Sequence, residues 1–442
     1  MAKQRSHHPV HGDTEHISDA ENGNGEADEH TSLLHKATSK FTAPTKMPSR
    51  EDGESQFHYL MRASVVSSRA MLFNSYVNVL LPVFPIAIVA GVLKWNPMVV
   101  FVLNFLAIVP LAGLLAYATD QLAQELGETI GGLVNATFGN VTELLVSILA
   151  LREGQIRVVQ ASMLGSILSN TLLVLGCSFL AGGWNKSFQE FNAISAGTMG
   201  SLLTVASAAL IIPSALFSVL SDSSASTSQA ISVLSKGTSI ILLLLYFLYL
   251  YFQLGSHKDL FKGQEGGEEE EESHFLSKWS ASVWLVIITV AVAFSADFLV
   301  DAIDAVVEES GLSKTFIGLV LIPIVGNAAE HATAVIVSVK DKMDLAIGVA
   351  LGSSLQIALG LTPLLVLIGW AMGQPMTLHF ATFETIIFFI SVVVVNYLLV
   401  DGKSTYLEGA MLLAMYIIIG LAFYVYPDDA GQGAKGLFAS NP

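Results

Sequence analysis

The pentapeptide GNVTE at residues 139–143 returns as GNAAE at residues 326–330. A second pair follows, with LGSIL at residues 164–168 and LGSSL at residues 351–355. Both pairs are offset by 187 positions (326 − 139 and 351 − 164). Chance similarity between apolar segments would not keep asparagine, glutamate and serine in step. The chain therefore contains an internal repeat, and each copy carries one acidic motif.

The motifs lie in a chain whose composition indicates a polytopic membrane protein. Of its 442 residues, 52% are hydrophobic and 13% are charged, whereas soluble domains carry about 25% charged residues. A transmembrane helix needs about 20 apolar residues, and eleven segments meet this condition: 73–93, 98–119, 126–151, 157–182, 195–217, 230–254, 280–303, 315–339, 343–371, 378–400 and 405–425. These runs are continuous, which excludes the alternating ten-residue strands of a β-barrel.

We therefore predict an all-α membrane protein with eleven transmembrane helices. One N-terminal helix (70–96) precedes two five-helix repeats, 97–256 and 279–426. An odd number of helices in each repeat gives the two copies opposite orientations in the membrane. This is the plan of many secondary transporters, whose binding sites lie near the midplane between inverted repeats.

The remaining segments are polar. Residues 1–69 are predicted to be a disordered cytosolic tail without a secretory signal, and residues 427–442 a short C-terminal tail. The distribution of Lys and Arg favours a cytosolic N-terminus, although Arg152 and Arg157 count against it. Cys177 is the single cysteine, so no disulfide framework is expected.

An acidic cytosolic linker or helix is predicted at residues 257–278. Its acidic residues are interpreted either as a solvated linker or as a regulatory segment that gathers cations by its field: Glu265, Glu268, Glu269, Glu270, Glu271 and Glu272.

The repeated glutamates, Glu143 and Glu330, are the main candidate site residues. A charge at mid-bilayer costs about 2.5–3.5 kcal/mol on insertion scales, so it normally faces a cavity or a partner. One such glutamate could simply join helices by hydrogen bonding. Two glutamates in register across a repeat favour a functional site.

Other oxygen donors accompany the glutamates. Asn140 and Asn327 stand three residues before them, a spacing that places both side chains on one face of a continuous helix. Glycine at 139 and 326 permits close approach of another backbone, and Pro323 is expected to break the second helix. The next helices supply further donors: Ser166, Ser353 and Gln356.

This donor set predicts a site for a hard cation. Ca²⁺ takes six to eight oxygen ligands in flexible geometry, and Mn²⁺ also accepts oxygen. A set without cysteine and nearly without histidine argues against Zn²⁺ and Cu⁺. The serines and the glutamine alone would instead be interpreted as helix–helix hydrogen bonds.

The energy source is inferred from what the sequence lacks and from charge balance. No GxxxxGK[ST] phosphate-binding loop is present, so ATP-driven pumping is not expected. Two carboxylates that release one divalent cation and take up two protons keep the same net charge, which favours cation/proton antiport. A cation channel, and an intramembrane enzyme that uses Glu330 and His331 as acid and base, are the rival hypotheses.

A family resemblance supports the antiporter. The stretches GNVTELLVSILAL, ASMLGSILSNTLLVLG, PIVGNAAEH and ALGSSLQ resemble the two signature repeats of the cation/proton exchanger family, within the Ca²⁺/cation antiporter superfamily. The resemblance covers residues 70–425 and is closest to fungal vacuolar Ca²⁺/H⁺ exchangers. The sodium/calcium exchangers of that superfamily instead carry Pro-Glu, which is absent here.

The resemblance implies that Glu143 and Glu330 bind Ca²⁺ and H⁺ in alternation at a vacuolar membrane. Supporting roles are implied for Gly139, Gly326, Asn140, Asn327, Ser166, Ser353 and Gln356. His331 matches the proton-coupled branch, although from the residues alone a hydrogen-bonding anchor is the simpler interpretation. Ca²⁺, H⁺ and membrane lipids are the expected partners; no cofactor, nucleic acid or enzymatic activity is expected, and homo-oligomerisation is left open.

Overall fold

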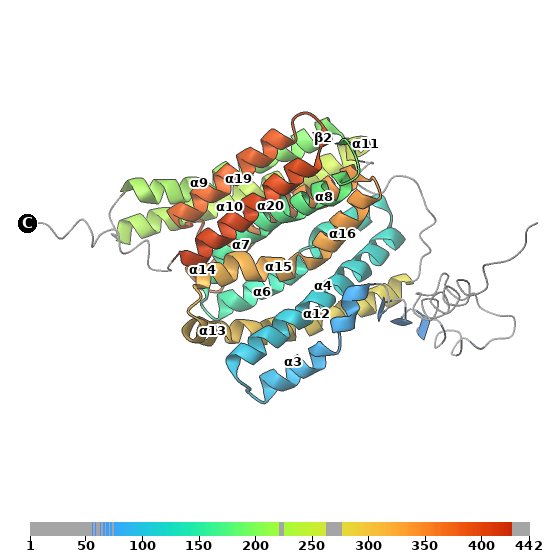
Figure 1. Ribbon diagram of the computed structural model, residues 1–442. Coiled ribbons are helices and arrows are strands. Elements are labelled where there is room, and N and C mark those ends of the chain that lie inside the picture. Colours follow the sequence, from blue (N-terminus) through green and yellow to red (C-terminus); the bar gives the residue numbers. More distant parts are fainter. Residues whose placement is uncertain are drawn as a thin grey trace, which may run out of the picture. The chain divides into compact units, whose positions relative to one another are not determined.

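The structure, a computed structural model, describes a few separate residues between 55 and 72 and then the ranges 75–220, 225–261 and 276–426. These ranges are mainly α-helical (Figure 1). Most of the predicted N-terminal tail, the acidic residues 265 and 268–272, and the predicted C-terminal tail 427–442 lie outside the described residues.

The helices follow one another with short connections. In chain order they are the 3₁₀-helix η1 (Tyr76–Leu80), α3 (Val83–Val92), α4 (Pro97–Leu126), α5 (Glu128–Phe138), α6 (Val141–Arg152), α7 (Ile156–Leu168), the π-helix η2 (Ser169–Val174), α8 (Leu175–Gly183), α9 (Ala193–Leu220), α10 (Ala225–Tyr251), the π-helix η3 (Phe252–Ser256), α11 (Lys258–Phe261), α12 (Lys278–Asp301), α13 (Ile303–Ser310), α14 (Lys314–Phe316), the π-helix η4 (Ile317–Leu321), α15 (Ile322–Gly326), α16 (Ala328–Val339), α17 (Met343–Leu355), the π-helix η5 (Gln356–Leu361), α18 (Thr362–Ala371), α19 (Thr382–Leu398) and α20 (Tyr406–Val425).

Eight helices in the described part are long and apolar enough to cross a membrane. A ninth span results if the bent pair 314–326 and 328–339, with an angle of 55° between its parts, is counted as one. Two shorter apolar helices, Val77–Val92 and Thr382–Leu398, coincide with the first and tenth predicted segments. Each of the eleven predicted segments thus overlaps a helix, but length and composition by themselves establish eight or nine spans.

The helix bounds follow the sequence repeat. α6 (Val141–Arg152) and α16 (Ala328–Val339) begin and end 187 residues apart (328 − 141 and 339 − 152), as do α7 and α17. The π-helices η2 and η5 keep the same offset (356 − 169 and 361 − 174). π-helices are rare and occur frequently at functional sites. A matching pair next to the repeated motifs therefore indicates that these helices contribute to a functional site.

Both motif helices are interrupted at their asparagines. Asn140 separates α5 from α6, and Asn327 separates α15 from α16. The first motif still lies within one apolar span, Ile130–Arg152, whereas the second lies at a bend of 55°. The break in the second half was expected at Pro323, but that residue lies inside α15, near its start, where its missing N–H is tolerated. The backbone instead leaves helical geometry at the asparagine, in the same way in the half that has no proline.

Helices from the two halves of the sequence pack against each other throughout the fold. α4 lies beside α12, α8 beside α20 and α9 beside α19 (Figure 1). A two-stranded antiparallel sheet joins β1 (Gln189–Glu190) to β2 (Lys403–Ser404). One apolar core extends across most of these helices, so neither half forms a separate unit in the described part.

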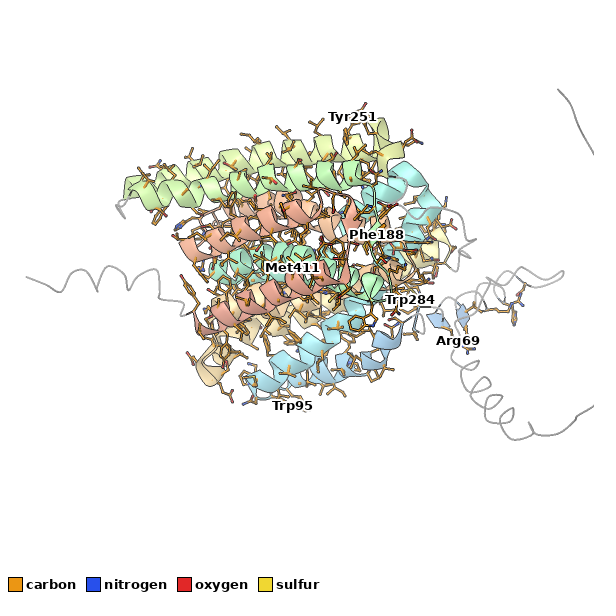
Figure 2. The ribbon with its side chains drawn as sticks, turned by 45° about the horizontal axis from the view of Figure 1, so that its top comes forward. Arg69, Trp95, Phe188, Tyr251, Trp284 and Met411 are labelled. Atoms are coloured by element: carbon orange, nitrogen blue, oxygen red, sulfur yellow. The ribbon has the colours of Figure 1, made fainter. Side chains whose placement is uncertain are left out.

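The outward faces of the helices are apolar. Large hydrophobic side chains are exposed along α9, α10, α12 and α20. Trp95, Tyr251 and Met411 are among the exposed residues (Figure 2). Apolar side chains facing outward on long apolar helices are suited to lipid, and tryptophan and tyrosine are enriched where a membrane meets water.

Glycines allow a close backbone contact between the two halves. A Cβ on Gly165 of α7 would overlap the backbone carbonyl of Leu319 in η4. A Cβ on Gly318 would lie 2.8 Å from the carbonyl oxygen of Val158. Both obstacles are backbone atoms, which cannot rotate away, so only glycine allows α7 and η4 to pack at this distance.

We expect Gly165→Ala to destabilise the protein by about 1–3 kcal/mol, because the methyl group must push two helices apart. The matched control is Gly352→Ala, at the equivalent position of the other repeat, where a Cβ would meet no atom within 4 Å. Thermal unfolding of both variants in detergent tests this. Equal midpoints for the two variants would show that the contact does not constrain the fold.

Candidate cation-binding site

Glu143 is a buried carboxylate in the first turn of α6. The residue is 3% exposed, and neither of its carboxylate oxygens has a hydrogen-bond partner among the described residues. The residue opposite is Gly326 of the second motif, where a Cβ would lie 2.8 Å from Oε1 of Glu143. The carboxylate of the first motif therefore lies directly against the backbone of the second motif.

Glu330, in the first turn of α16, is half-buried and lines a cavity of about 230 Å³. The cavity is formed by α4, α5, α10, η3, α16, α17 and η5, and also contains Asp120, Asn135, Ser353 and Gln356. Asp120 at its edge is exposed, so the cavity connects Glu330 with the surroundings. Glu143 does not line it, although the two carboxylates are close enough for their charges to interact.

The two asparagines contact the opposite half of the sequence. Nδ2 of Asn140 donates to Oε1 of Gln356 at 2.5 Å. Nδ2 of Asn327 donates to the backbone carbonyl of Ser166 at 3.4 Å. Neither asparagine uses its side chain to cap the helix that it precedes. Each amide therefore joins its own motif to the third helix of the other repeat.

Six oxygens around these contacts are buried and have no hydrogen-bond partner in the described part of the chain. They are Oδ1 of Asn140, both carboxylate oxygens of Glu143, Oγ of Ser166, Oδ1 of Asn327 and Oε2 of Glu330. A buried polar atom without a partner costs about 1–3 kcal/mol, so such a cluster needs an explanation. A hard cation that binds oxygen atoms would supply the missing partner.

The charge of this cluster comes from the two glutamates. Within the described ranges, no three His, Cys, Asp or Glu side chains gather at one point. A cation here would be held by two carboxylates together with amide and hydroxyl oxygens. This donor set fits Ca²⁺, or Mn²⁺, better than it fits Zn²⁺.

The predicted site residues are connected by these contacts. Gly139 joins the group because a Cβ there would lie 3.5 Å from Oε1 of Gln356. Ser353 lines the cavity together with Glu330. His331 faces the first half, with Nε2 3.3 Å from Oγ of Ser169.

Ser169 was not predicted as a site residue. It begins η2, and it stands at the position equivalent to Gln356, which begins η5 (356 − 169 = 187). Each of these two residues contacts the motif of the opposite half. The repeat offset was therefore the signal that could have identified Ser169.

Acidic residues near the helix ends have structural partners. The Lys314 ammonium, hydrogen-bonded to Asp304, holds the pKa of that carboxyl below its usual value. The Lys186 ammonium acts in the same way on the pKa of Asp341. Glu408 accepts from the backbone of Thr405 at the start of α20. These residues fasten helix ends and lie outside the oxygen cluster.

Comparison with known proteins assigns the class. The family described as sodium/calcium exchanger protein matches residues 96–255 and 280–425, which is most of the chain. The chain belongs to this family, whose members are ion exchangers.

The names of individual relatives describe the transported ions more closely than the family name does. The vacuolar calcium ion transporter of Schizosaccharomyces pombe is 48% identical over 360 residues, covering 81% of this chain and 87% of the relative. The vacuolar cation/proton exchanger 2 of Oryza sativa subsp. japonica is 44% identical over 382 residues, covering 85% and 87%. The crystal structure of the Ca²⁺/H⁺ antiporter protein YfkE, 36% identical, superimposes with a TM-score of 0.67 and covers 78% of this chain and 98% of that chain. The resemblance to cation/proton exchangers is thereby confirmed.

The contact between Gly326 and Glu143 can be tested separately from the glutamates. We expect Gly326→Ala to lower the affinity for divalent cations at least tenfold, because its methyl group would lie 2.8 Å from Oε1 of Glu143. Gly237→Ala in α10 is the control, since a Cβ there meets no atom within 4 Å. Calorimetric titration of both purified variants with Ca²⁺ is the measurement; unchanged binding by Gly326→Ala would exclude this cluster as the cation site.

Proposed function

We propose that this chain is a secondary antiporter that moves cytosolic Ca²⁺ into an acidic vacuole in exchange for H⁺. The observation that carries the proposal is the meeting of two repeated motifs, one from each half, at a cluster of buried oxygens without partners. The names of the relatives support it, since they include a vacuolar calcium ion transporter and Ca²⁺/H⁺ antiporters.

Glu143 and Glu330 bind either Ca²⁺ or protons in this mechanism. With Ca²⁺ bound, both carboxylates are ionised and the amide and hydroxyl oxygens complete the coordination. Without Ca²⁺, two ionised carboxylates so close together in an apolar surrounding repel each other, and protonation relieves the repulsion. The site therefore carries Ca²⁺ in one direction and protons in the other, and an empty charged site is disfavoured.

Alternating access follows from inverted repeats. The cavity that reaches Glu330 lies where α4 and α10 end and α17 begins. With a cytosolic N-terminus, this is the cytosolic end, whereas Glu143 is buried toward the opposite end. The site would thus face the cytosol here, and a second conformation would open it to the vacuole.

His331 is assigned to proton coupling in this proposal. It follows Glu330 directly, and its ring reaches Ser169 in the other half. An imidazole next to Glu330 can accept and release protons. The acidic segment around residues 265–272 is proposed to gather Ca²⁺ at the cytosolic mouth.

Two alternatives remain distinct from this proposal. A Ca²⁺-permeable channel would use the same acidic site but would need no exchange partner. A Mn²⁺-preferring exchanger would use the same donors, because Mn²⁺ also accepts oxygen ligands. The enzyme hypothesis has no support from the relatives, which are transporters.

We expect Glu143→Gln and Glu330→Gln each to reduce Ca²⁺ uptake to background, because each removes one of the two charges that balance Ca²⁺. The control is Glu190→Gln in β1, whose carboxylate is exposed and is 3.6 Å from Lys403. Uptake of radioactive Ca²⁺ into vesicles with an acidic interior measures exchange. Retained uptake by either site variant would defeat the paired-carboxylate mechanism.

The same vesicles separate the antiporter from the channel. Collapse of the pH gradient with a protonophore should stop Ca²⁺ accumulation if protons drive it. Accumulation that continues at the same rate would indicate a channel. Competition with Mn²⁺ in this assay would rank the two ions, and stronger inhibition by Mn²⁺ than by unlabelled Ca²⁺ would favour the Mn²⁺-preferring exchanger.

A further inference from the structure

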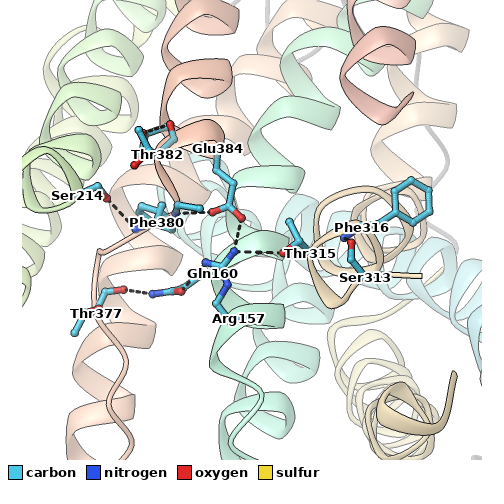
Figure 3. A network of polar contacts seen from close by, with 12 residues as sticks. Arg157, Gln160, Ser214, Ser313, Thr315, Phe316, Thr377, Phe380, Thr382 and Glu384 are labelled. Atoms are coloured by element: carbon cyan, nitrogen blue, oxygen red, sulfur yellow. Dashed lines mark hydrogen bonds and ion pairs between the residues drawn. The ribbon is translucent and has the colours of Figure 1, made fainter. Parts of the chain in front are cut away.

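The starts of α7, α14 and α19 meet around one arginine (Figure 3). Nη2 of Arg157, in α7, donates to Oε1 of Glu384 at 2.5 Å and to Oγ1 of Thr315 at 3.3 Å. Glu384 belongs to α19 and Thr315 to α14, so Arg157 connects the first half of the sequence with two helices of the second half. None of these three residues lines the cavity beside Glu330.

Both carboxylate oxygens of Glu384 accept hydrogen bonds, and its side chain is buried. The side chain of Glu384 is 0% exposed, whereas that of Arg157 is 42% exposed. Oε2 of Glu384 accepts from the backbone N–H of Ala381 at 3.0 Å, at the start of α19. Gln160 accepts from Arg157 and donates to the carbonyl oxygen of Thr377, in the segment before α19. Separation of the pair would leave a buried carboxylate without its cation, which is strongly unfavourable.

The equivalent position of the other repeat has different chemistry. Asp344 stands 187 residues after Arg157 (344 − 157) and begins α17 as Arg157 begins α7. Its Oδ1 accepts from the backbone N–H of Asn192, just before α9. Gly348, one turn further along α17, lines the cavity. At these equivalent positions, the end with the cavity is thus joined by a hydrogen bond to a backbone N–H, and the end with Glu143 buried behind it by an ion pair. Lys186 and Asp341 form a further ion pair at the cavity end, but the side chain of Asp341 is 68% exposed, whereas that of Glu384 is fully buried.

We propose that Arg157 and Glu384, with Thr315 and Gln160, form a latch that keeps the Arg157 end of the transporter closed at rest. Opening that end to Glu143 requires Arg157 to separate from Glu384. The latch biases the resting protein toward the conformation in which Glu330 meets the cavity. This inference rests on the alternating access of the proposed function, but it concerns the conformational step and not the transported ion.

A cysteine reporter can detect the opening. Ser147 lies on α6 one turn after Glu143, is 1% exposed, and its helix continues to Arg152 beside the start of α7. Ser147→Cys in a Cys177→Ser background leaves one thiol in the chain, because Cys177 is its single cysteine. The rate of reaction with a small, charged, membrane-impermeant thiol reagent, supplied from the Arg157 side of oriented proteoliposomes, reports access to that position.

The expected result is slow labelling with the latch intact and labelling about tenfold or more faster in Glu384→Gln, as the closed population falls. The amide oxygen of glutamine still accepts from Ala381, so α19 keeps its cap. Arg157→Gln with Glu384→Gln removes both charges without leaving a buried carboxylate and should also label fast. Asp344→Asn, at the cavity end, is the control and should leave labelling slow.

Slow labelling in the double-glutamine variant, in protein that elutes as a single symmetric peak, would overturn the proposal. Fast labelling in Asp344→Asn would overturn it as well, because the effect would then not be specific to one end. The readout needs neither Ca²⁺ nor a pH gradient. Fast labelling of the latch variants, together with no Ca²⁺/H⁺ exchange by the protein whose latch is intact, would therefore support the latch and refute the proposed function. Slow labelling of the latch variants, together with Ca²⁺/H⁺ exchange by the protein whose latch is intact, would refute the latch and support the proposed function.

Discussion

Two carboxylates of like charge are held close together inside an apolar helix assembly, and the surrounding structure is organised around this constraint. In the described part of the chain, no donor forms a hydrogen bond with either carboxylate oxygen of Glu143 or with Oε2 of Glu330. Their neighbours supply mainly further acceptors, which would make the repulsion worse without a cation or protons. In the proposed mechanism, the missing partner of these buried oxygens is a bound ion and not the chain.

The candidate site is held together by contacts that cross between the two halves of the sequence. Asn140 bonds to the second half through Gln356, and Asn327 bonds to the first half through the carbonyl of Ser166. Glu143 lies against Gly326 of the opposite motif. Each donor is thus positioned by a residue of the other repeat. A change in the relative position of the halves would alter both sets of contacts together, which is the coupling that an alternating site needs.

The repeat made much of this arrangement predictable. The offset of 187 residues paired Glu143 with Glu330, and the matching helices of the structure begin and end at the same offset. It did not predict that the helices break at Asn140 and Asn327, because asparagine interrupts a helix only in a particular tertiary setting, whereas Pro323 carries an obvious local signal. Nor could it reveal that Asn327 bonds to a backbone carbonyl, since every residue has one. In the sequence, Arg157 counted against the predicted orientation in the membrane. Its ion pair with the buried Glu384 depends on the packing of α7 against α19, which the sequence does not reveal.

The glycine contact between α7 and η4 determines which parts of the molecule can move separately. Gly165 and Gly318 bring two backbones so close that sliding between them would drive carbonyl oxygens into neighbouring chain atoms. α7 carries Ser166, and η4 leads through α15 to Asn327, so these two candidate ligands belong to one closely packed unit formed from both halves of the sequence. The proposed alternating access would then have to use other surfaces, such as the long contact between α4 and α12, where the packing is made by side chains. In that mechanism, the boundary between moving and stationary parts would not coincide with the boundary between the repeats.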